Sequence, residues 1–399
     1  MNTTWYRDNP SRRYLFRTSI WIFGFFSTMQ ITTWIPLRYW GIWGGGNFVD
    51  IGQLLHWGDC YNEYGIKVYG DVTSETLGYC GGYIYPRQVV QFIDLLNLAR
   101  IDVKFLGFIS LLLLSFILAY VLRNLPKISL ATISIVISPP IMLIADRANV
   151  DILITLLALF GAFALNRSYF YIAVILFFFT VLIKFYTLPT LFVFFLYAKN
   201  MKKRIFLVLS IVFAFILIHK DLSFVSNLLG NENERQFGIN VWSSYLSDYN
   251  LFKPFSTYLP LIDYFIFFLC ICFVLYCQRN KEFRLIEIGQ TLDIKRNAVF
   301  TLFATISIAV FVAGTSVDYR LLLLIIPTCV LINNSIFRFI AKELFILLLV
   351  GLWLSFPSGG LEPIGDLAVE ILVAVLTLIM VGVLKSHLRS MNILTRIRN

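Results

Sequence analysis

Long apolar runs alternate with short polar segments along most of the chain. A bilayer core of about 30 Å takes roughly 20 apolar residues as a helix, and a backbone in lipid must satisfy its own hydrogen bonds. This pattern predicts spans at residues 18–36, 105–122, 128–145, 151–165, 204–219, 259–277, 298–313, 320–335, 343–357 and 366–384. The run 169–198 is too long for one span and contains Lys184 and Pro189, which predicts two short or broken segments. We therefore expect an all-α polytopic membrane protein with about twelve segments in a single integral membrane domain, residues 1–399.

Composition supports this interpretation. Of the 399 residues, 58% are hydrophobic and 14% are charged, and the mean hydropathy is +0.77. An ordinary soluble domain carries about a quarter charged residues, so this composition excludes a soluble globular enzyme. The formal net charge of +10 does not indicate nucleic-acid binding, because the basic residues are scattered between apolar runs.

The positions of the charges predict the topology. With both termini inside, the inner segments hold 22 of the 33 basic residues and only 5 of the 23 acidic ones, which satisfies the positive-inside rule. Residues 278–297 are then a cytoplasmic loop and 385–399 a basic cytoplasmic tail. Residues 37–104 and 220–258 are extracytoplasmic loops, and they are long enough to build a site.

The first outer loop contains candidate chemistry. Asp50 lies just past the first span, where a carboxylate is placed to accept a proton from a substrate hydroxyl; an isolated loop Asp is also often a solvated or helix-capping residue. Residues 87–101 follow Pro86 and alternate polar and apolar side chains at near-helical spacing, which predicts an amphipathic helix on the membrane surface. Cys60 and Cys80 are candidates for a disulfide if this side is oxidising.

A second set of polar residues lies at the outer ends of predicted spans: Asp146, Arg147, Asp151, Lys184, Asp318 and Arg320. Ionisable side chains at membrane depth are costly and are usually paired or functional. Lys184 on a broken helix suits a phosphate, although a snorkelling lysine is an equal alternative. Arg147 and Asp151 are also spaced for a simple ion pair within one helix.

The order of these segments resembles a known family. The segment 138–151 (SPPIMLIADRANVD) resembles the span-turn-span region of polytopic GT-C glycosyltransferases, and it is most similar to the bacterial glycosyltransferase family 87 type. Asp146 and Ala148 stand in this chain where that family usually has Glu and Gly. The segments 182–189 (LIKFYTLP) and 318–327 (DYRLLLLIIP) resemble its later motifs. In the first loop, the residues that resemble the family are Asp50, Cys60, Gly65 and Tyr83 to Pro86.

The resemblance implies an inverting hexosyl- or pentosyltransferase that uses a polyprenyl-phosphate sugar donor and a glycan or lipid-linked acceptor. It implies Asp50, or else Asp59, as the catalytic base, and Arg147, Lys184 and Arg320 as phosphate-binding cations. The supporting residues that it implies are Asp146, Asn149, Asp151, Tyr186, Asp318 and Tyr319. A bacterial inner membrane is the implied location.

Other functions fit parts of the sequence. A lipid-linked sugar flippase or secondary transporter commonly needs polar residues near mid-membrane on several helices, and two related halves. The two halves of this sequence do not look alike. An O-antigen ligase or polymerase would differ only in its acceptor, and a non-catalytic scaffold is a third alternative. The sequence has no nucleotide-binding signature, so we expect a lipid-linked donor and no cofactor, with a divalent metal left open.

Overall fold

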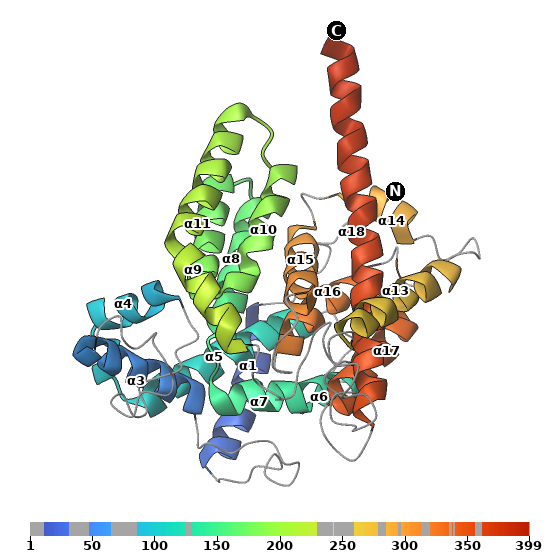
Figure 1. Cartoon of the computed structure of the whole chain (residues 1–399). Coiled ribbons are helices and arrows are strands. Elements are labelled where there is room, and N and C mark those ends of the chain that lie inside the picture. The colour runs from blue at the N-terminus through green and yellow to red at the C-terminus, as the bar shows by residue number, and fades with distance from the viewer. Residues whose placement is uncertain are drawn as a thin grey trace.

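The computed structural model describes residues 12–31, 48–64, 86–123, 130–229, 242, 259–277, 285–293, 297–312, 320–334, 337, 340–355 and 361–398. All regular secondary structure within these ranges is helical (Figure 1). The all-α expectation is therefore confirmed for this part of the chain. The proposed residues Gly65, Cys80, Tyr83, Asp318 and Tyr319 lie outside the described residues.

The helices follow one another along the chain in three groups. The first group is α1 (Arg12–Ile31), α3 (Val49–Tyr64), α4 (Arg87–Leu95), the 3₁₀ helix η3 (Leu98–Arg100), α5 (Val103–Leu122), α6 (Leu130–Val136) and α7 (Pro139–Arg147). The second is α8 (Asp151–Asn166), α9 (Phe170–Ile183), η4 (Phe185–Thr187), α10 (Leu188–Val193), η5 (Phe194–Leu196) and α11 (Met201–Leu229). The third is α13 (Leu259–Cys277), α14 (Leu285–Thr291), α15 (Ala298–Val312), α16 (Leu321–Ile332), α17 (Ala341–Leu354) and α18 (Glu362–Arg398).

Several helices are apolar enough to cross a membrane. Among the described residues, two helices satisfy both length and composition: Val103–Leu122 and the part of α18 from Glu362 to Arg389. The bent pair α7 and α8 makes a third if it is counted as one span, and five further apolar helices are 10–17 residues long. The apolar runs of the sequence are therefore helical, as expected.

The expectation of one continuous span over residues 128–145 is wrong. The structure divides this run into α6 and α7, which meet at Ser138. Pro139 begins α7 and has no N–H to donate, so the helix of α6 cannot continue through it. Helices α7 and α8 are bent by 104° at the next break. In Figure 1, α6 and α7 lie across one end of the bundle, transverse to α8.

The bundle has two flanks that meet at α15. On one flank α9 packs against α8 and α11, and on the other α18 packs against α13, α14 and α17; α15 contacts α8, α10 and α18 (Figure 1). Helices α14 and α18 approach each other closely, because a Cβ on Gly382 would lie 2.1 Å from the carbonyl oxygen of Ile286. The cytoplasmic loop predicted at 278–297 thus contains a helix that packs on the bundle. The basic tail predicted at 385–399 continues α18 without a break to Arg398.

The two helices of the first predicted outer loop lie beside the bundle. Helix α4 begins directly after Pro86, as expected, but ends at Leu95, because Asn97 has a left-handed backbone (φ 51°) that stops the helix. Its Val90 and Ile93 are buried, whereas Phe92, Leu95 and Leu96 are exposed. Asp221 of α11 holds its first turn through an ion pair with Arg87 (2.7 Å). The helix predicted after Pro86 is therefore present but shorter than predicted, and its placement on a membrane surface stays a prediction.

Candidate functional site

The site is built on the sharp turn between α7 and α8. Ala148 has a left-handed backbone (φ 49°, ψ 49°), which ends α7 directly after Arg147. Asn149 then accepts a hydrogen bond on Oδ1 from the backbone N–H of Asp151 (2.9 Å), a local contact that favours the turn over a continuing helix. A left-handed backbone is more easily adopted by glycine than by alanine, so Ala148 carries some conformational strain at this turn. The turn places Arg147, Asn149 and Asp151 on a corner rather than on one helix face.

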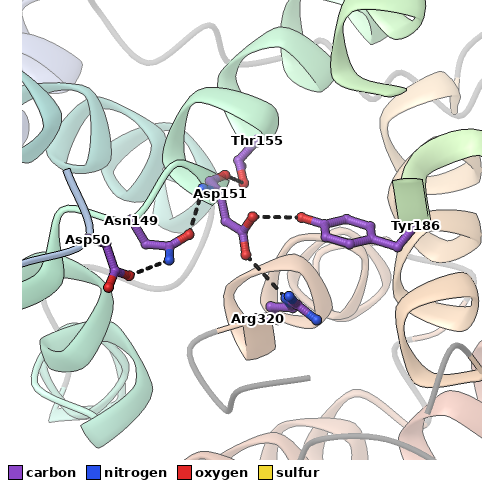
Figure 2. A network of polar contacts seen from close by, with 6 residues as sticks. All are labelled: Asp50, Asn149, Asp151, Thr155, Tyr186 and Arg320. Atoms are coloured by element: carbon purple, nitrogen blue, oxygen red, sulfur yellow. Dashed lines mark hydrogen bonds and ion pairs between the residues drawn. The ribbon is translucent and has the colours of Figure 1, made fainter. Parts of the chain in front are cut away.

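Asp50 reaches this corner from the start of α3. Its Oδ1 accepts from Nε and Nη2 of Arg147 at 2.7 and 2.6 Å, and its Oδ2 accepts from Nδ2 of Asn149 (Figure 2 draws the contact with Asn149). The Asp50 side chain is 8% exposed. Arg147 therefore pairs with a carboxylate nearly one hundred residues away in sequence. The alternative of an ion pair between Arg147 and Asp151 within one helix is wrong, because the two residues lie in different helices and have these other partners.

Phe48 fixes the position of Asp50. Its backbone is left-handed (φ 64°), a conformation that costs a bulky residue on the order of 1–3 kcal/mol, and it is 1% exposed. Its N–H donates to the carbonyl oxygen of Asp146 (2.7 Å), which ties the start of α3 to α7. Its ring packs on Gly107 of α5, where there is no side chain, and edge-on against Phe108. The residue two positions before Asp50 is thus held by α5 and α7 together.

Asp151 is the second buried carboxylate of the network. Its Oδ1 accepts from the hydroxyl of Tyr186 (2.8 Å), and its Oδ2 accepts from Nε of Arg320 (3.4 Å) (Figure 2). The Arg320 guanidinium also lies 5.1 Å from the centre of the Tyr186 ring, a cation–π distance. The Asp151 carbonyl accepts from the hydroxyl of Thr155 (2.7 Å). Asp151 therefore joins α8 to the η4 and α16 segments.

Lys184 enters the same region from a helix break. Helix α9 ends at Ile183, and Lys184 has an extended backbone (φ −146°, ψ 127°). The break falls at Lys184 itself, and Pro189 lies in the first turn of α10, which begins at Leu188, rather than ending α9. Lys184 is 7% exposed and interacts electrostatically with Asp151, Arg320 and Asp50. The buried ammonium thus belongs to the network, which favours a site residue over a lysine that extends away from the bundle.

The two arginines of this network are more exposed than its carboxylates. The side chains of Arg147 and Arg320 are 27% and 14% exposed, compared with 8% for Asp50 and 1% for Asp151. A ligand that approaches from solvent meets guanidinium groups first. Guanidinium groups bind phosphate and carboxylate through paired N–H donors. The arrangement is therefore suited to an anionic ligand with the carboxylates behind it.

Asp146, one of the predicted supporting residues, has a partner that the sequence did not indicate, and its supporting role stays a prediction. Its Oδ1 accepts from Nε2 of Gln30, a buried residue of α1, at 3.2 Å. Gln30 near the end of a predicted apolar span is a signal that sequence reasoning passed over. Gln30, Phe48 and Thr155 are the residues added to the site by the structure.

Other predicted residues lie apart from this network. Asp59 is exposed and nine positions beyond Asp50 on α3, which at 1.5 Å per residue is about 13 Å along the helix. Cys60 is disulfide-bonded, and Cys270, Cys272, Cys277 and Cys329 are free; Cys80, its proposed partner, lies outside the described residues. Within the described ranges, no group of three or more His, Cys, Asp or Glu side chains is placed to hold a metal ion.

A second group of buried carboxylates lies between α13 and α18. Glu370 is 1% exposed and accepts hydrogen bonds from Nε1 of Trp242 (2.6 Å) and Sγ of Cys270 (3.5 Å). Asp263 and Asp366 are also buried and interact electrostatically with Glu370. Sequence reasoning did not single these residues out, although acidic residues inside apolar runs are the signal that finds them.

No family model, curated protein or solved structure matches the chain at a significant level. The support for the candidate site is therefore the set of contacts described above.

Proposed function

We propose that the protein is a membrane glycosyltransferase that transfers a sugar from a polyprenyl-phosphate donor to an acceptor hydroxyl, with inversion. The observation that carries the proposal is the convergence of Asp50, Arg147, Asn149, Asp151, Lys184, Tyr186 and Arg320 into one largely buried polar network. These residues come from four separate stretches of the chain: residue 50, residues 147–151, residues 184–186 and residue 320. A network of ionised groups in an apolar bundle is costly to bury, so a functional role explains it better than stability does.

The cations have a clear task in this reaction. As the donor sugar is transferred, the bond from its anomeric carbon to the phosphate oxygen breaks, and the electron pair stays on the phosphate. Arg147, Lys184 and Arg320 stabilise this growing negative charge. Asp151 is a positioning residue, because its two oxygens hold Tyr186 and Arg320.

Asp50 is the base in this proposal. The acceptor oxygen attacks the anomeric carbon from the side opposite the phosphate, and its proton passes to an Asp50 oxygen, so the charge and atoms balance. Inversion follows from the single displacement. Asp50 is the better candidate because it belongs to the buried network, whereas Asp59 is exposed and lies outside it.

The membrane arrangement is part of the same proposal. About twelve membrane segments of a GT-C-like fold, with both termini cytoplasmic, place the network on the extracytoplasmic face. The lipid-linked donor then enters sideways from the bilayer, in a bacterial inner membrane. The acceptor is a glycan or a lipid-linked hydroxyl.

The test is transfer of radiolabelled sugar from polyprenyl-phosphate donors in proteoliposomes. Asp50→Asn should lower transfer by about 10²- to 10⁴-fold, the usual contribution of a general base, while donor binding persists. Lys184→Ala should give a graded loss, and Asp59→Asn is the matched control on the same helix. Full transfer by Asp50→Asn, or equal loss in Asp59→Asn, would contradict the assignment of the base.

A transporter of lipid-linked sugars is the second candidate function. The buried carboxylates Asp263, Asp366 and Glu370 favour it, because transporters place ionisable groups inside their helical bundles. Movement of labelled donor across the bilayer without its consumption would support this function and contradict sugar transfer. An O-antigen ligase or polymerase would be distinguished by transfer of a preassembled glycan.

A further inference from the structure

The two oxygens of Asp50 are held in different ways. Oδ2 accepts from the amide of Asn149, which is itself anchored because its Oδ1 accepts from the backbone N–H of Asp151 (2.9 Å). Oδ1 accepts from the guanidinium of Arg147 (2.6 and 2.7 Å), which ends a long and flexible side chain. One oxygen therefore has a neutral partner that is itself held by the backbone, and the other has a charged partner that is more exposed to solvent.

A carboxylate held in this way is poorly placed to take a proton from a substrate. Both oxygens of Asp50 already accept hydrogen bonds, and Oδ1 accepts from two guanidinium N–H groups, which use the lone pairs that an acceptor hydroxyl would need. Loss of the Asn149 contact would let the carboxylate move. Loss of the Arg147 contact alone would free one oxygen and leave the Asn149 contact in place.

An anionic ligand is placed to remove that contact. Arg147 is more exposed, at 27%, than Arg320 or either carboxylate, so an incoming phosphate reaches it before it reaches the buried carboxylates. Lys184 adds attraction for an anion at this point, since it interacts electrostatically with Asp50 as well as with Asp151, and Arg320 pairs with Asp151. Guanidinium binds phosphate through the same paired N–H groups with which Arg147 now holds Asp50.

We propose that Arg147 is an exchangeable partner: a phosphate group that enters the site takes over its guanidinium and releases Oδ1 of Asp50, while Asn149 keeps the carboxylate in place. The inference rests on the proposed function for the identity of the phosphate ligand. It makes the base available only when a phosphate is bound, so the donor binds before the acceptor is activated.

The exchange is tested without sugar transfer, by carbodiimide labelling of carboxylates followed by peptide mass spectrometry. The reconstituted protein is labelled alone, with inorganic phosphate, with polyprenyl phosphate and with the phosphate-free polyprenol. Asp59 is the internal standard, because it is exposed and lies on the same helix. We expect the ratio of Asp50 to Asp59 labelling to rise several-fold with polyprenyl phosphate and to stay unchanged with polyprenol. A rise with inorganic phosphate too would mean that the headgroup alone is sufficient.

Variants of Arg147 distinguish two cases: a phosphate that replaces Asp50 as the partner of Arg147, and a phosphate that binds Arg147 while the contact with Asp50 persists. In Arg147→Ala, Asp50 should be labelled strongly with or without phosphate. In Arg147→Lys, which keeps the charge but lacks the paired N–H donors of the guanidinium, Asp50 labelling should be intermediate. Arg100→Ala, at an exposed arginine of η3, is the matched control and should behave as wild type. Unchanged or reduced Asp50 labelling with both phosphates would overturn the inference. A labelling switch in a protein that transfers no sugar would keep the inference and overturn the proposed function.

Discussion

Replacing Gly107 with Ala tests whether the packing of Phe48 positions Asp50. A Cβ at residue 107 would lie 2.2, 2.3 and 2.6 Å from three atoms of the Phe48 ring, whereas carbon atoms in contact are about 3.5–4.0 Å apart. The ring would have to move by more than about 1 Å. It has little freedom to do so, because Phe48 is buried and its N–H donates to Asp146.

The expected magnitude has two parts. Overpacking of this kind costs roughly 1–3 kcal/mol of stability. If Asp50, two residues along, is displaced by about 1 Å as well, the transfer rate should fall by roughly 10²-fold. A misplacement of this size between a catalytic group and its substrate typically has an effect of this magnitude. We therefore expect Gly107→Ala to lower kcat far more than its loss of stability explains.

The assay combines sugar transfer in proteoliposomes with thermal unfolding in detergent. Gly161→Ala is the matched control, because its Cβ would meet the Phe177 ring at 2.7 Å, between α8 and α9. Gly24→Ala, where nothing lies within 4 Å, should be neutral in both measurements. The double variant Phe48→Leu with Gly107→Ala removes the clashing ring and should regain part of the stability. Equal kcat losses in Gly107→Ala and Gly161→Ala would refute a positioning role for Phe48.

Three further changes test other contacts. Tyr186→Phe removes the hydroxyl that donates to Asp151 and leaves a buried acceptor short of one partner, so unfolding should become easier by about 1–3 kcal/mol, with kcat lowered but not lost. Asp221→Ala removes the buried partner of Arg87, the first residue of α4. Cysteines introduced in α4 should then react faster with a thiol reagent, and an unchanged reactivity would contradict the idea that Asp221 holds α4 against α11. Gly382→Ala would place a Cβ 2.1 Å from the backbone oxygen of Ile286, so the yield of folded protein should fall while transfer per folded molecule stays near wild type.

The apolar periodicity of the sequence determined which segments are helical. Long runs without charge have no other means to satisfy their backbone in an apolar environment, so helices occupy the predicted spans. Local chemistry also fixed some boundaries, such as Pro86 before α4 and Pro139 at the start of α7. The span expected at 128–145 is interrupted for the same kind of local reason, because the adjacent Pro139 and Pro140 cannot continue the preceding helix although the segment is apolar.

The candidate residues of the site followed from the cost of burying charge. Asp50, Arg147, Asp151, Lys184 and Arg320 each stand out as ionisable groups at the ends of apolar runs, and the structure brings all of them together. Which residues form the candidate site could therefore be predicted from the sequence.

Only the tertiary structure decided how these residues pair. Spacing along the chain favoured Arg147 with Asp151, but the left-handed turn at Ala148 separates them, and α3 brings Asp50 to Arg147 instead. The contributions of Gln30 and Phe48 depend on α1, α5 and α7 lying against one another, which no local pattern specifies. Sequence sets which charges must be buried, because that cost belongs to each residue, whereas their partners are set by packing between segments distant in the chain.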